Sequence, residues 1–144
     1  MNKLTIELVP STSWGNNVRS IVTKAQWDVI RKESYKKADH KCEICGGKGK
    51  RHAVECHEIW DYNEDTNTQT LKGLISLCPA CHMVKHAGRS FAIGKPYVVI
   101  NQLKKVNECT EAQAYRDIAE AFTLHEERSK KTWTVDISYL NKYK

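Results

Sequence analysis

Two cysteine pairs with identical spacing constrain the fold of this 144-residue chain more than any other feature. Cys42 and Cys45 form one CxxC pair, and Cys78 and Cys81 form the second. A CxxC turn points both sulfurs at one ion, and two such turns complete the tetrahedral sphere that zinc prefers. Because four protein ligands leave no open position, we expect this zinc ion to stabilise the fold rather than to take part in chemistry.

Histidines in the same stretch indicate a second metal site. His82 and His86 are four residues apart on a helix that Pro79 is expected to begin, so both imidazoles lie on one helical face. The run around His57 alternates in the manner of a strand. One side of that strand carries Glu55, His57 and Ile59, and the other carries Val54, Cys56 and Glu58. If the strand packs against the helix, the three histidines can hold one divalent ion.

The order of these motifs resembles the HNH endonucleases, also called the His-Me finger or ββα-metal family. The resemblance rests on the two CxxC pairs and on three runs: ECHEIW at 55–60, LKGLISLC at 71–78 and CHMVKH at 81–86. It covers residues 42–88, about a third of the chain, and is closest to small bacterial and phage members. It implies two strands and a helix around a catalytic Mg²⁺, Mn²⁺, Ni²⁺ or Zn²⁺, besides the structural Zn²⁺. The implied activity is hydrolysis of phosphodiester bonds in nucleic acid, with DNA expected before RNA.

Carried over residue by residue, the resemblance assigns His57, His82 and His86 to the catalytic ion. Glu58 occupies the position of the family's general-base histidine, and Gly73 occupies that of its central asparagine. We therefore expect Glu58, beside His57, to act in catalysis as the proton acceptor or as a further metal ligand. Because the asparagine normally orients the base histidine, the two departures from the family pattern are expected to be coupled.

A second register of the family motif is also open. In this register Cys56 is the residue on the metal side, and His57 is the base. The first register is preferred because the second leaves Glu58 without a role. A thiolate ligand would also suit zinc better than magnesium.

The excess positive charge lies in the first part of the chain. Residues 1–52 carry eleven Lys/Arg and five Asp/Glu, whereas residues 53–144 carry twelve of each, which accounts for the net charge of +6. Such asymmetry favours a polyanionic partner, and nucleic acid is the first expectation. The side chains expected to contact phosphates are Lys48, Lys50, Arg51, Lys85 and Arg89.

We expect an α+β fold in which an HNH-like core at residues 42–88 is stapled by the four-cysteine zinc. All 144 residues are expected to form one domain, with 1–41 and 89–144 as a frame around the core. The frame is expected to begin with a strand and a helix and to end with helices and a short strand. These segments are a strand at 3–8, helices at 24–38, 97–107 and 110–129, and a strand at 132–137, with irregular residues at 87–96 and 138–144.

The sequence also favours a cytoplasmic location. The chain contains no apolar run of membrane-spanning length, and its first residues lack the pattern of a secretion signal. In a reducing compartment, CxxC pairs point to metal rather than to disulfides.

Three functions are compatible with these features. The first is a metal-dependent HNH-type endonuclease. The second is a degenerate HNH fold that keeps its zinc but only binds nucleic acid or a protein, for example as an inhibitor in phage–host conflict. The third is a zinc-stabilised transcription factor, although no recognition helix or repeated finger is evident. The departures at Glu58 and Gly73 favour the second function, whereas the three histidines favour the first.

Overall fold

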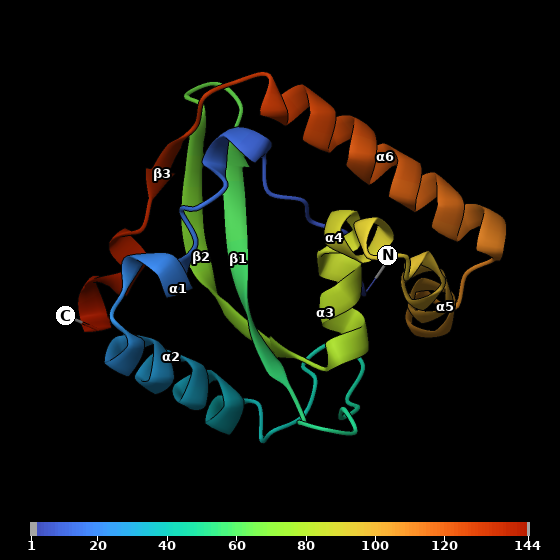
Figure 1. The fold of residues 1–144 in the computed structure, drawn as a ribbon, viewed down its shortest axis with the longest axis horizontal. Helices are drawn as coiled ribbons and strands as arrows, with labels where there is room; N and C mark the ends of the chain where they lie inside the picture. The colour runs from blue at the N-terminus through green and yellow to red at the C-terminus, as the bar shows by residue number, and fades with distance from the viewer. Residues whose placement is uncertain (1–2, 144) are drawn as a thin grey trace.

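An antiparallel hairpin lies at the centre of the computed structural model, which describes residues 3–143 (Figure 1). Strands β1 (Glu55–Asn63) and β2 (Thr68–Leu77) pair over their full length, with a bulge after Ile59. The side chain of Asn63 closes the hairpin by accepting hydrogen bonds from two backbone amides of the turn. A short third strand, β3 (Thr134–Asp136), adds to β2 in parallel, so the sheet order is β1-β2-β3.

One side of the hairpin is covered by the N-terminal helices and the end of the chain. Helix α1 (Val18–Ile21) leads into α2 (Lys24–Lys37), and the 3₁₀ helix η2 (Ser138–Tyr143) lies beside them (Figure 1). A capping box begins α2, in which the Thr23 side chain accepts from the Gln26 amide and the Gln26 side chain accepts in return. A hydrophobic cluster fills the space between these elements and the sheet: Val18, Ile30, Leu71 and Leu140.

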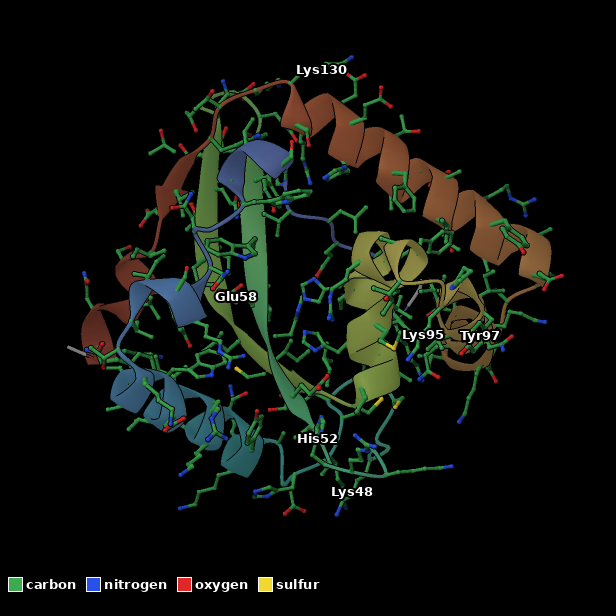
Figure 2. All side chains as sticks on the ribbon, in the orientation of Figure 1. Lys48, His52, Glu58, Lys95, Tyr97 and Lys130 are labelled. Carbon is green, nitrogen blue, oxygen red and sulfur yellow. The ribbon has the colours of Figure 1, made fainter. Side chains whose placement is uncertain are left out.

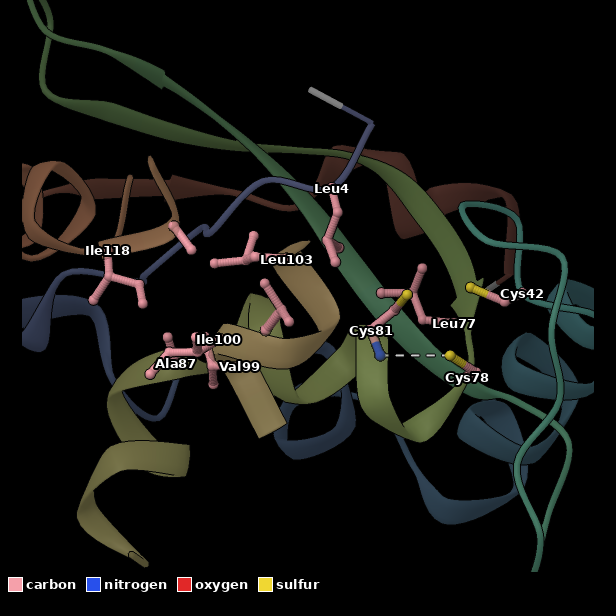
Figure 3. Packing of buried hydrophobic residues seen from close by; sticks show 12 residues of the cluster. Leu4, Cys42, Leu77, Cys78, Cys81, Ala87, Val99, Ile100, Leu103 and Ile118 are labelled. Carbon is pink, nitrogen blue, oxygen red and sulfur yellow. Dashed lines mark hydrogen bonds between the residues drawn. The ribbon is translucent and has the colours of Figure 1, made fainter. Parts of the chain in front are cut away.

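The other side of the hairpin faces four helices in succession. They are α3 (Pro79–Lys85), α4 (Ala87–Ala92), α5 (Pro96–Asn107) and α6 (Glu111–Ser129). The main core lies between them and includes Leu77, Val99 and Leu103, with cysteine side chains at one end (Figure 3). This continuity means that the cysteine region and the apolar core support each other.

Several elements expected from the sequence are confirmed. Helix α2 begins at the predicted residue 24 and ends one residue before the predicted end at 38. Helices α5 and α6 match the predicted ranges 97–107 and 110–129 to within one residue. The Thr110 side chain accepts from the Gln113 amide at 3.1 Å and so caps the start of α6. The strand expected at 132–137 is present as β3. No helix within residues 3–143 combines the length and the apolar character needed to cross a membrane.

The prediction of a strand at residues 3–8 is wrong. This segment is extended but joins no sheet. Instead, the Leu4 amide donates to Asn107 Oδ1 at 2.9 Å, and Asn107 Nδ2 donates to the Leu4 carbonyl at 2.8 Å. A helix side chain thus satisfies the backbone groups that a neighbouring strand would otherwise pair.

Two segments expected to be irregular are ordered. Residues 87–92 form α4, because Ser90 is buried and its hydroxyl donates to the carbonyls of Met83 and His86. Residues 138–143 form η2, because Leu140 is buried in the cluster beneath it. In both segments tertiary burial outweighs the weak local pattern.

Candidate metal centre

The four cysteines of the two CxxC pairs come together in one cluster. Their sulfurs all lie within 4.8 Å of one another, and Cys45 Sγ is 3.6 Å from Cys78 Sγ. Cys42, Cys78 and Cys81 are buried, while Cys45 is exposed. Four thiolates at this spacing match the donor set of a structural zinc ion, so the cluster can hold a metal ion such as zinc.

Backbone and side-chain N–H groups are directed at the sulfurs. The amides of Cys45 and Cys81 donate to the first sulfur of their own pairs, each at 3.4 Å. Gln102 Nε2 donates to Cys81 Sγ at 3.3 Å. Hydrogen bonds to a thiolate favour the charged form that binds metal. Hydrogen bonds from the neighbouring thiols lower the pKa of Cys42, whereas the hydrogen bonds that Cys78 and Cys81 make with Cys42 raise the pKa values of these two thiols.

The second cysteine pair also starts the helix that carries two histidines. Cys78 is the N-cap residue of α3, and Pro79 occupies the first turn, as the sequence predicted. Cys81 is fully buried in the main core. The cysteine cluster therefore fixes both the start and the inner face of α3.

Three histidines from β1 and α3 form a second cluster. Ring nitrogens of His57, His82 and His86 all lie within 4.8 Å of one another. Their ring centroids are 4.7–5.2 Å apart, and the ring planes cross at 70–78°. Three imidazoles that meet edge to face can direct one nitrogen each toward a common point, which is the arrangement of a three-histidine metal site.

A carboxylate orients His82 within this cluster. Glu55 Oε1 lies 2.9 Å from His82 Nδ1, and Glu55 Oε2 lies 2.7 Å from His52 Nε2. Because a carboxylate only accepts, Nδ1 of His82 carries the proton and Nε2 is left for a metal. Such carboxylate–histidine pairs commonly orient metal ligands in proteins.

His57 is the most buried of the three histidines. It is 5% exposed, and its Nε2 has no hydrogen-bond partner within residues 3–143. Burial lowers the pKa of His57, and desolvation together with repulsion from His57 and His82 lowers the pKa of His86 to about 3. His57 and His86 are therefore neutral at pH 7, which is the form that binds metals. An unsatisfied, buried Nε2 in a three-histidine cluster fits a divalent ion.

Glu7 is the carboxylate beside His57. Its Oε1 lies 3.8 Å from His57 Nε2 and 3.1 Å from Lys85 Nζ. Burial alone would raise the pKa of Glu7, but its contacts with His57 and Lys85 outweigh burial and lower that pKa. Glu7 is 45% exposed and lines a cleft of about 320 Å³ together with His57, His86, Asp61 and Arg128.

Glu58 lies outside the histidine cluster. Successive residues of a strand point to opposite faces, and the Glu58 carboxylate accepts hydrogen bonds from the Val18 amide, at the start of α1, and from the Trp60 side chain. Burial raises the pKa of Glu58. Glu58 is therefore not a member of the histidine cluster, although it lines the same cleft of about 320 Å³ as His57 and His86.

Cys56 and Gly73, the other residues singled out by the resemblance to HNH endonucleases, lie on the two strands of the hairpin. Cys56, the metal-side residue of the second register, interacts with Ser34 and Tyr35 on α2, and burial raises its pKa to about 11. It belongs to neither cluster among the described residues. Gly73 pairs with Ile59 at the bulge, and a Cβ at Gly73 would come no closer than 4.0 Å to a neighbouring side chain.

The basic residues expected to contact phosphates divide into two groups. Lys48, Lys50, Arg51 and Arg89 are exposed. Lys85 is 5% exposed, and its ammonium group is held by Glu7 and by Thr5 Oγ1 at 2.9 Å. The expectation that Lys85 presents its charge to a nucleic acid is corrected by this burial.

Two carboxylates of the site were not assigned a role from the sequence. Glu55 shares a strand face with His57, and that alternation was the signal that could have identified it. Glu7 lies fifty residues before His57, in a segment whose alternation predicted a strand but not which residues of the chain it would meet.

Comparisons with known proteins provide no relative from which a function could be transferred. No protein-family model matches the chain, and no curated protein or solved structure matches it.

Proposed function

We propose that this protein is a metal-dependent phosphodiester hydrolase that acts on nucleic acid, with DNA as the first expected substrate. The observation that carries the proposal is the edge-to-face cluster of His57, His82 and His86, in which His57 Nε2 is buried without a hydrogen-bond partner in the described chain. A binding protein has no need for this arrangement, because a buried unsatisfied nitrogen destabilises the fold.

The three histidines would hold a divalent ion, and each is supported by a different contact. Glu55 fixes the ring orientation of His82, while His57 is held by burial in β1. When bound, such an ion supplies a Lewis acid for a phosphate oxygen and a water of lowered pKa. His86 lies at the solvent edge of the cluster, where a substrate can approach.

Glu7 replaces Glu58 as the proposed proton acceptor. Both glutamates line the cleft that contains His57 and His86, but only the carboxylate of Glu7 has a lowered pKa, so Glu7 is ionised at neutral pH. Glu58 is held by the start of α1 and by Trp60, and it has a raised pKa. Lys85 positions Glu7 through their ion pair rather than by contacting phosphate.

Exposed basic side chains support binding of a polyanion. Arg89 lies three residues after His86 on α4, and Lys48, Lys50 and Arg51 lie on the loop that leads from the cysteine cluster to β1. Side chains of this kind contact backbone phosphates without reading sequence, so binding should weaken steeply as salt rises.

The direct test combines metal content with cleavage. The zinc-loaded protein is incubated with plasmid and single-stranded DNA in Mg²⁺, Mn²⁺, Ni²⁺ or Zn²⁺. We expect cleavage with at least one ion, and we expect His82→Asn and His86→Asn to abolish it. His40→Asn, an exposed histidine outside both clusters, is the matched control. Absence of cleavage with every ion, or cleavage unaffected by either cluster variant, would refute the proposal.

The role of Glu7 is tested separately. Glu7→Gln removes the negative charge but retains the shape of the side chain, so we expect kcat to fall by about 10²–10⁴-fold, as for loss of a general base. The second ion should remain bound, which total metal analysis can show. Glu120→Gln on the exposed face of α6 is the control. An unchanged kcat in Glu7→Gln would exclude this assignment.

A second candidate is a binding module without hydrolysis. It is favoured by Glu58, because the residue at the family's base position holds α1 instead of facing the histidines. Metal analysis separates the two candidates. Two ions per chain support the hydrolase, whereas one zinc ion per chain with a gel shift and no cleavage supports the binding module.

A further inference from the structure

A second cavity, of about 510 Å³, lies next to the metal centre. It shares His86 with the histidine cluster, and Arg89 lies on its lining. Its walls include the aromatic rings of Trp14, Trp60 and His125. A cavity of this volume lies within the range of small-molecule sites, and aromatic walls provide flat surfaces for stacking.

Polar groups in this cavity lack partners. Gln69 is 1% exposed and Ser13 is 2% exposed, and both line the cavity. Gln69 Oε1 and Ser13 Oγ have no hydrogen-bond partner in the part of the chain that the structure describes. Each such group destabilises the free protein unless a ligand or water satisfies it. Two of them on the wall of one cavity indicate a ligand with its own polar edge.

Trp14 is held at the cavity in an exposed position. Its side chain is 68% exposed, although its indole N–H donates to the Val9 carbonyl at 3.0 Å. The ring lies roughly parallel to that of His125, with centroids 6.3 Å apart and planes crossing at 22°. Exposed apolar surface often marks a binding site. The indole of Trp14 is held in a fixed orientation, so it is suited to stack on a planar ring.

We propose that this cavity binds an unstacked purine base, with guanine preferred, of the strand that reaches the metal centre. The link to a strand rests on the proposed function, whereas binding of the base does not. Trp14 supplies a stacking face, as aromatic side chains do in single-strand binding sites. Arg89, exposed beside His86, supplies a phosphate contact that connects the base to the metal centre.

The preference for guanine follows from the acceptors that line the cavity. Glu58 and Gln69 line the cavity and carry acceptor oxygens, so we infer that the bound edge brings N–H donors. Guanine offers two adjacent donor groups on its Watson–Crick edge, whereas adenine offers one amino group beside an acceptor nitrogen. A carboxylate has about four lone-pair sites, so Glu58 can accept further hydrogen bonds besides those from Val18 and Trp60. Ser13 Oγ can donate to the guanine carbonyl.

The test uses the zinc-loaded full chain and free nucleotides, so it does not depend on cleavage. GMP, AMP, CMP and UMP are titrated by calorimetry. We expect GMP to bind at least about tenfold more tightly than the pyrimidine nucleotides, in line with the effects of base stacking and donor recognition. Equal affinity for all four nucleotides, or no binding, would overturn the proposal and point to an apolar ligand or a protein side chain as the occupant.

Two variants test the roles of Trp14 and Gln69 in the binding of GMP. Trp14→Ala should weaken GMP binding by about tenfold through loss of stacking. Tyr97→Ala should not, because Tyr97 is an exposed aromatic residue on α5 far from Glu58 (Figure 2). Gln69→Leu should reduce the preference for GMP over AMP without lowering thermal stability, because it removes an unsatisfied buried oxygen. Unchanged GMP binding in both variants would refute the assignment.

The outcomes also separate this inference from the proposed function. His82→Asn should abolish cleavage but retain the preference for GMP. A GMP preference in a protein that never cleaves nucleic acid would refute the hydrolase proposal alone. Cleavage by a protein without any nucleotide preference would refute the base-binding proposal alone.

Discussion

At His82 a single carboxylate decides which ring nitrogen faces the other histidines. Glu55 holds Nδ1 at 2.9 Å and is itself 2.7 Å from His52 Nε2, so Nε2 of His82 is directed to the cluster. The alternation of β1 placed Glu55 and His57 on one face in the sequence, but it did not indicate which residue of the helix Glu55 would meet. That pairing depends on how α3 packs against β1.

Glu55→Gln should weaken binding of the second ion. The amide can still fill the position, but it no longer stabilises the proton on His82 Nδ1 as a charged acceptor. We expect a loss of metal affinity of about 10–100-fold, the usual effect of removing such an orienting partner. Titration with Mn²⁺ or Zn²⁺ in zinc-preloaded protein measures it, with Glu120→Gln as the control. Equal affinities in the two variants would contradict the role of Glu55.

Gly49→Ala should destabilise the loop that packs on the start of α3. A Cβ at this position would overlap the His52 carbonyl oxygen and lie 2.7 Å from Pro79 Cδ. Because backbone must move, we expect the free energy of unfolding to fall by about 1–3 kcal/mol. Gly73→Ala is the control, since its Cβ would be 4.0 Å from the nearest side-chain atom. Denaturant unfolding of the two metal-loaded variants compares them.

At the scale of elements, the N-terminal segment is held by a helix rather than by a sheet. Asn107, the last residue of α5, makes both hydrogen bonds with the backbone of Leu4, whose side chain is fully buried. The alternation of residues 3–8 predicted a strand, but this segment joins no sheet. A strand pattern reports which side chains are buried, but not which groups satisfy the backbone.

Asn107→Ala should therefore loosen this segment. It leaves the amide and the carbonyl of buried Leu4 without partners, and we expect a loss of about 1–3 kcal/mol in the free energy of unfolding. Asn101→Ala, an exposed asparagine on the same helix, should change it by less than about 0.5 kcal/mol. Because the segment also carries Glu7, hydrogen exchange should increase at residues 4–8. Unaltered exchange there would argue against this anchoring.

Across the whole molecule, the cysteine cluster is the link between the core and the histidines. Cys78 caps α3, and Cys81 is buried beside the apolar side chains of the main core (Figure 3). Helix α3 in turn carries two of the three histidines. The stability of the fold and the geometry of the second site are thus expected to depend on the same four sulfurs.

Removal of the metal ion from the cysteine cluster should abolish both the stability of the fold and the geometry of the histidine site. We expect Cys81→Ser, or prolonged chelation, to eliminate cooperative thermal unfolding and binding of the second ion. Cys109→Ser should retain both, because Cys109 lies outside the cluster, at the edge of the main core, where its thiol donates to the Leu103 carbonyl. Thermal unfolding monitored by circular dichroism, with total metal analysis, tests this. A chelated protein that still unfolds cooperatively would contradict the dependence on zinc.

The sequence by itself determined what depends on spacing and period. The two CxxC pairs defined a four-sulfur cluster, the four-residue step from His82 to His86 placed both on one helical face, and the periodic helices at 24–38, 97–107 and 110–129 are present. These features are local, so a short stretch of chain contains their whole cause. The three-stranded arrangement of the sheet and the helix at 87–92 did not follow from local pattern, because burial against distant elements produces them.

Only the tertiary structure decided which carboxylates meet the histidines. A family position suggested Glu58, but the pleat of β1 turns it toward α1, while Glu7 reaches His57 from a segment fifty residues away. The cavity with unsatisfied Ser13 and Gln69 was likewise invisible in the sequence. Spacing sets the face on which a side chain lies, whereas its partner across the molecule is set by packing of elements that are remote in the chain.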